Sequence, residues 1–75
     1  MFAGKRTPSR DRLICLGVGL SATLAELQDL LRRSGCAELY PRDRRDAIII
    51  YGVTRGQTLQ EINDALFQNN ENTLI

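Results

Sequence analysis

The 75-residue chain contains no histidine and no tryptophan, and its only cysteines are Cys15 and Cys36. Without histidine, and with no second thiol close to either cysteine, a zinc site has too few ligands, so we expect no metal and no cofactor. The same lack leaves only carboxylates and Lys5 as general bases. We therefore predict a protein that is not an enzyme, with no catalytic residues.

Long apolar runs are also missing, and no stretch approaches the roughly 20 residues that span a bilayer. The start of the chain has no signal-peptide core, so we expect a cytoplasmic protein with reduced thiols. With two Phe and two Tyr, the core must be built from aliphatic side chains. Because so short a chain barely fills one core, we expect a protein partner or self-association, and no small-molecule ligand is indicated.

An internal repeat dominates what is present. Residues 10–40 align without gaps on residues 45–75 at an offset of 35, and 11 of the 31 aligned pairs are identical, where about two are expected by chance. A period near 35 is typical of helix-pair units. The identical pairs are Arg10/Arg45, Asp11/Asp46, Ile14/Ile49, Gly17/Gly52, Val18/Val53, Thr23/Thr58, Leu24/Leu59, Glu26/Glu61, Asp29/Asp64, Leu31/Leu66 and Leu39/Leu74.

The second half of each repeat has the pattern of a capped helix. Thr23 with Glu26, and Thr58 with Glu61, have the spacing of capping boxes, and apolar residues follow at helical intervals. Gly35 and Asn69-Asn70 are suited to a left-handed stop after each helix. The segments Leu39-Tyr40-Pro41 and Leu74-Ile75 are expected to fold back and seal the core.

The first half of each repeat is less decisive, because residues 13–18 and 47–53 are apolar runs that also suit a strand. Charged residues before both runs indicate first turns of helices, and two isolated strands would make a poor sheet. We predict an all-α domain of residues 10–75, with two tandem 35-residue helix-turn-helix hairpins packed as four helices, after a disordered tail at 1–9. The alternative is a β-α-β-α domain completed by dimerisation.

A cluster of arginines surrounds the junction of the repeats, within a chain of net charge +1. It can contact phosphate, or it can be a solvated face paired with nearby acids, and the interleaved Glu38, Asp43 and Asp46 favour the second reading. DNA is therefore a possible partner and a membrane is not. The candidate contact residues for a nucleic acid or a protein partner are Arg32, Arg33, Arg42, Arg44 and Arg45.

Two further patterns have a functional and a structural interpretation. Residues 11–28 partly fit a DNA-reading helix-turn-helix with Gly19 at the turn, but later core positions arrive one residue early, which favours an ordinary helical hairpin. The carboxylate pairs Glu26/Asp29 and Glu61/Asp64 lie in first turns, where acids normally serve caps and helix dipoles rather than catalysis. Tyr51 is expected in the core, with its hydroxyl at an edge.

The segment 39–52, followed by 58–67, resembles a region that follows the repressor-type helix-turn-helix domain in some bacterial transcriptional regulators, largely from Firmicutes. Residues 16–20 and 31–35 are similar to the first hairpin of that region. The resemblance implies a helical module accessory to transcriptional regulation, for protein contact rather than base reading. We therefore expect a non-catalytic regulatory protein-interaction module, with direct DNA binding through the arginine cluster as the alternative.

Overall fold

The computed structural model describes residues 8–75, which form four α-helices and no strand: α1 (Pro8–Gly19), α2 (Leu24–Arg33), α3 (Arg44–Thr54) and α4 (Leu59–Gln68). The predicted all-α, four-helix fold is confirmed. Because α1 begins at Pro8, two residues of the predicted tail 1–9 are helical, and the remainder lies outside the described residues. Within residues 8–75, no helix is long and apolar enough to cross a membrane.

The apolar runs at 13–18 and 47–53 lie inside α1 and α3, so the strand alternative is wrong. Burial follows helical spacing: Arg10, Ile14 and Gly17 are buried in α1, as are their equivalents in α3. Asp43 caps α3, since its carboxylate accepts the Asp46 amide at 3.1 Å. Burial of one helix face therefore outweighs the strand propensity of the β-branched residues.

Side-chain caps and left-handed residues set the ends of the helices. Both predicted capping boxes are formed, with Thr23 and Glu26 on α2 and Thr58 and Glu61 on α4. Each of the four helices ends in a Schellman motif, in which one residue with positive φ turns the chain and two amides satisfy helix carbonyls. These residues are Ser21, Gly35, Gly56 and Asn70, at φ 59°, 74°, 70° and 59°. The turn after α1 is thus made at Ser21, and Gly19 belongs to the helix.

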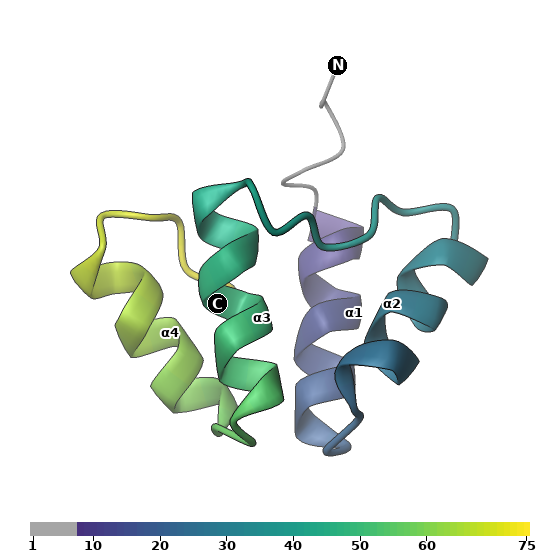
Figure 1. Cartoon of the computed structure of the whole chain (residues 1–75), viewed down its shortest axis with the longest axis horizontal. Helices are drawn as coiled ribbons and strands as arrows, with labels where there is room; N and C mark the ends of the chain where they lie inside the picture. The colour runs from purple at the N-terminus through teal and green to yellow at the C-terminus, as the bar shows by residue number, and fades with distance from the viewer. Residues whose placement is uncertain (1–7) are drawn as a thin grey trace.

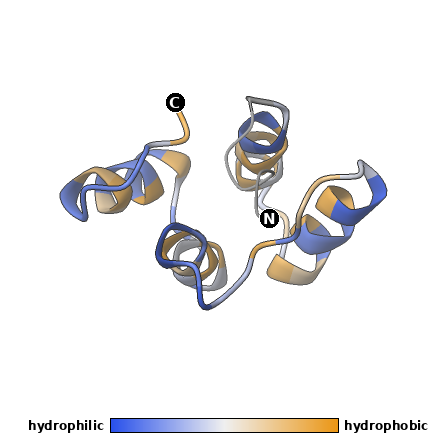
Figure 2. Ribbon diagram, turned by 90° about the horizontal axis from the view of Figure 1, so that it is seen from above, coloured by the Kyte–Doolittle hydropathy of each residue, from blue (hydrophilic) through white to orange (hydrophobic). Residues whose placement is uncertain are grey.

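The two repeats form two equivalent hairpins. Hairpin 1 comprises α1, α2 and the tail 34–40, and hairpin 2 comprises α3, α4 and the tail 69–75. In Figure 1, α1 and α3 occupy the middle, α2 and α4 the flanks, and both hairpin turns lie at the lower end. Across the junction α1 packs against α4 and α2 against α3, and Figure 2 shows the four helices around a common centre. This reciprocal arrangement is that of an approximate twofold axis.

The core uses the same four positions of each hairpin. Of the two segments predicted to seal the core, Leu39 and Leu74 are buried, whereas Tyr40 and Ile75 are 53% and 81% exposed and do not contribute. Tyr51 is 57% exposed, so its predicted place in the core is wrong. Gly17 and Gly52 let the helices of each hairpin approach, since an added Cβ would lie 2.6 Å from Leu27 Cδ1 or 2.5 Å from Ile62 Cγ1. The core pairs are Ile14/Ile49, Leu27/Ile62, Leu31/Leu66 and Leu39/Leu74.

Candidate functional site

Four charged residues are buried where the hairpins meet. Arg10 and Asp11 lie in the first turns of α1, and Arg45 and Asp46 in the first turn of α3. None of the four is more than 8% exposed. Because an unpaired buried charge is very costly, each must find a partner within the fold.

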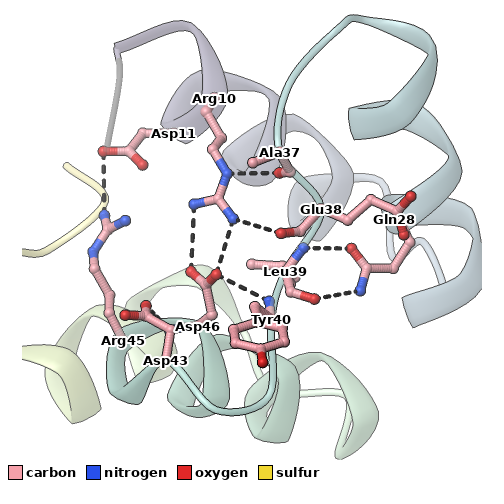
Figure 3. A network of polar contacts seen from close by, with 10 residues as sticks. All are labelled: Arg10, Asp11, Gln28, Ala37, Glu38, Leu39, Tyr40, Asp43, Arg45 and Asp46. Carbon is pink, nitrogen blue, oxygen red and sulfur yellow. Dashed lines mark hydrogen bonds and ion pairs between the residues drawn. The ribbon is translucent and has the colours of Figure 1, made fainter. Parts of the chain in front are cut away.

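The charges pair across the junction, as Figure 3 shows. Arg10 donates two hydrogen bonds to Asp46, from Nη2 to Oδ2 at 3.0 Å and from Nη1 to Oδ1 at 3.3 Å. Reciprocally, Arg45 Nη2 lies 3.2 Å from Asp11 Oδ2. Each hairpin therefore provides one cation and one anion to the other.

The same arginines also bind the tail of their own hairpin. The Nε of Arg10 donates to the Ala37 carbonyl at 2.8 Å, and its Nη2 donates to the Glu38 carbonyl at 3.1 Å. Arg45 repeats both bonds with the carbonyls of Asn72 at 2.7 Å and Thr73 at 3.4 Å. Each guanidinium thus joins three elements: its own helix, its own tail and the other hairpin.

The two Arg–Asp pairs differ in how many of their polar atoms have hydrogen-bond partners. The Tyr40 amide donates to Asp46 Oδ2 at 3.0 Å, which further satisfies that carboxylate. Among the described residues, Asp11 Oδ1 and Arg45 Nη1 are buried without a hydrogen-bond partner. The Arg10–Asp46 pair is therefore the better satisfied of the two.

This network explains where the predicted contact residue Arg45 lies. At 6% exposure it faces Asp11 and the second tail rather than solvent, so its charge is not presented to a ligand. In the sequence, only its charge places Arg45 with the other arginines of the predicted contact set. The available signal was the Arg-Asp pair repeated at 10–11 and 45–46, which indicated a shared structural role.

The other four predicted residues are exposed, and we call Arg32, Arg33, Arg42 and Arg44 the basic end. Asp29 pairs with both Arg32 and Arg33, at 2.7 Å from the Nε of Arg33. Arg44 Nε lies 3.8 Å from a Glu71 carboxylate oxygen. Most of this positive charge is therefore already opposed by acids, in surface pairs that stabilise little.

Two shallow apolar grooves lie at equivalent positions of the hairpins. Groove 1 encloses about 480 Å³ along α1, and groove 2 encloses about 390 Å³ between α3 and α4. Leu16 in groove 1 is 52% exposed, close to the exposure of its counterpart Tyr51 in groove 2. Groove 1 is lined by Ser9, Arg12, Leu13 and Leu16; groove 2 is lined by Arg44, Ala47, Ile48, Tyr51, Ala65 and Asn69.

The remaining candidate groups are the carboxylates of α2 and α4 and the cysteine thiols. Glu26 and Glu61 complete the capping boxes, as expected, while Asp64 accepts a hydrogen bond from Gln60 at 3.1 Å. Burial raises the pKa of the Cys15 thiol, and the nearby Asp11 carboxylate raises it further against the opposing effect of Arg45. No group of three or more Cys, Asp or Glu side chains within residues 8–75 is placed to hold a metal ion.

The chain matches no protein-family model, and no curated protein or solved structure is significantly similar to it.

Proposed function

We propose that this chain is a non-catalytic protein-interaction module of the bacterial cytoplasm, accessory to transcriptional regulation. The pair of apolar grooves is the observation that carries the proposal. Small proteins rarely keep large apolar side chains together on the surface without a use, and Leu16 and Tyr51 are exposed at the same position of both hairpins. The regulatory context rests on the resemblance of residues 39–52 and 58–67 to a region of bacterial regulators.

The lining of the grooves indicates the chemistry of the partner. Each groove combines aliphatic or aromatic side chains with one arginine, Arg12 in groove 1 and Arg44 in groove 2. An apolar side chain would fill either hollow, and a carboxylate of the partner would pair with Arg12, since Glu71 already lies near Arg44. We therefore expect a short protein segment with apolar anchors and an acidic flank.

A displayed library of random peptides, selected on the full chain, tests this proposal. We expect enriched peptides that combine apolar and acidic residues, and amide NMR shifts within 9–16 and 44–51 when they bind. Replacing Leu16 and Tyr51 together by Asp should abolish selection, because both side chains are half exposed and line the grooves. Leu20→Asp is the matched control, since Leu20 is 72% exposed and lies in neither groove.

If no peptide is enriched more strongly on the wild-type chain than on the chain carrying both Leu16→Asp and Tyr51→Asp, the protein-contact proposal is refuted. Shifts confined to residues 32–42, outside both grooves, would equally contradict it.

The second candidate is DNA binding, favoured by the exposure of the four arginines of the basic end. It predicts that a generic duplex at low salt shifts amides between residues 32 and 45, and that added salt reverses the shifts. Changing Arg42 and Arg44 to Ala should then weaken binding. Since Asp29 pairs with Arg32 and Arg33, we expect no such binding. A salt-sensitive complex with the duplex would instead favour DNA binding over protein contact as the function.

A further inference from the structure

The interface between the hairpins is self-complementary. Its charged contacts run both ways, Arg10 to Asp46 and Arg45 to Asp11, and its helix contacts run from α1 to α4 and from α3 to α2. A twofold interface places the same patch on both partners, as in a symmetric dimer. Here the two partners are successive repeats of one chain.

Each hairpin, in turn, holds its own tail through a polar side chain of its second helix. Gln28 holds the backbone of Leu39 through two hydrogen bonds, at 2.7 and 2.9 Å, and Asn63 accepts the equivalent Leu74 amide at 2.8 Å. The tails are further bound by the arginine of the same hairpin. A hairpin on its own loses the ion pairs that cross the junction, and its share of the core is left uncovered.

Either hairpin of a second chain can supply both missing parts. We propose that this interface is an association surface whose second partner is another copy of the chain, so that two chains can exchange hairpins. The side-chain contacts are the same in the closed and the exchanged forms, and their free energies cancel. The equilibrium between the two forms is set by the connection between Tyr40 and Asp43. In the closed form this connection holds each hairpin near the other at an effective concentration on the order of millimolar.

The inference is independent of the proposed function, because it concerns the buried junction rather than the outer grooves. Its test uses two full-length variants with lesions at equivalent core positions. Ile49→Asp disables hairpin 2 and leaves hairpin 1 intact, while Ile14→Asp does the opposite; both isoleucines are fully buried. Neither chain can close on itself, so in dilute solution, where chains do not associate, each alone is expected to lose most of its helical signal.

Mixing the two variants at near-millimolar concentration should restore helicity and give a complex of twice the 8.4 kDa chain mass. With the Ile49→Asp chain labelled, its amides in residues 8–40 should return to their wild-type shifts. A dimer of Ile14→Asp alone, formed through two copies of hairpin 2, would also support the proposal. A mixture that stays as unfolded as its components overturns it.

Two additions to the Ile14→Asp chain show whether the restored complex uses the native junction. Adding Asp46→Ala should weaken the complex at least about 100-fold, because Arg10 of the other chain is left buried without its carboxylate. Adding Gln68→Ala, an exposed position at the end of α4 in the same hairpin, should leave it unchanged. Equal affinities for both additions would show a non-native association and overturn the proposal.

Discussion

Gly52 shows how one missing side chain fixes the spacing of a helix pair. A Cβ there would lie 2.5 Å from Cγ1 of the fully buried Ile62, so that side chain or the helix itself would have to shift. Gly52→Ala is therefore expected to destabilise the protein by about 1–3 kcal/mol despite the better helix propensity of alanine. Gly19→Ala is the control: nothing lies within 4 Å of its Cβ position, and we expect a neutral change or a gain of up to about 1 kcal/mol. Denaturant melts of both variants measure the difference.

Ser21 and Gly56 occupy the same turn position of the two hairpins, at φ 59° and 70°. A side chain makes this left-handed conformation costly, whereas glycine adopts it freely. Ser21→Gly should therefore stabilise the protein by about 1 kcal/mol, and Gly56→Ser should destabilise it by a similar amount. Thermal melts that move in the same direction for both substitutions would contradict this explanation.

At the scale of the element, sequence and structure agree most closely on α2 and α4. Their boundaries follow from Thr23 and Thr58 at one end and from Gly35 and Asn70 at the other, all of which act through neighbours close in sequence. For α1 and α3 the sequence left helix and strand open. The deciding interactions there are burial against the partner helix and the Arg-Asp pairs. They join residues that are not close in sequence, 36 positions apart for Arg10 and Asp46, so local patterns do not reveal them.

Gln28 and Arg10 hold the first tail, with two hydrogen bonds each to its backbone. Gln28→Ala removes both hydrogen bonds to the Leu39 backbone, so we expect a loss of about 1–3 kcal/mol and faster hydrogen exchange at the Leu39 amide. Gln60→Ala removes only an exposed bond to Asp64 and should change stability by less than about 0.5 kcal/mol. Unchanged protection of Leu39 in Gln28→Ala would show that Arg10 alone suffices to hold the tail.

For the whole molecule, the repeat in the sequence predicted the two hairpins but not the way they face each other. The residues assigned to contact show the limit clearly: Arg44 and Arg45 are neighbours of the same type, yet one lines a groove and the other is buried. Likewise Tyr51, apolar enough for the core, lies on the surface. Charge and hydropathy do not distinguish the two faces of α3 until α4 and the second tail are placed.

The reciprocal pairing of the hairpins holds the fold together, and the Arg10–Asp46 contact is its best satisfied point. A double-mutant cycle with Arg10→Ala, Asp46→Ala and the double variant measures it in denaturant melts. We predict losses of about 3–5 kcal/mol for each single variant and a coupling energy of about 2–3 kcal/mol. The exposed Arg33–Asp29 pair should couple by less than about 1 kcal/mol. If the losses of unfolding free energy for Arg10→Ala and Asp46→Ala add to within about 0.5 kcal/mol, the two residues are not coupled and the hairpins are not held together by this pair.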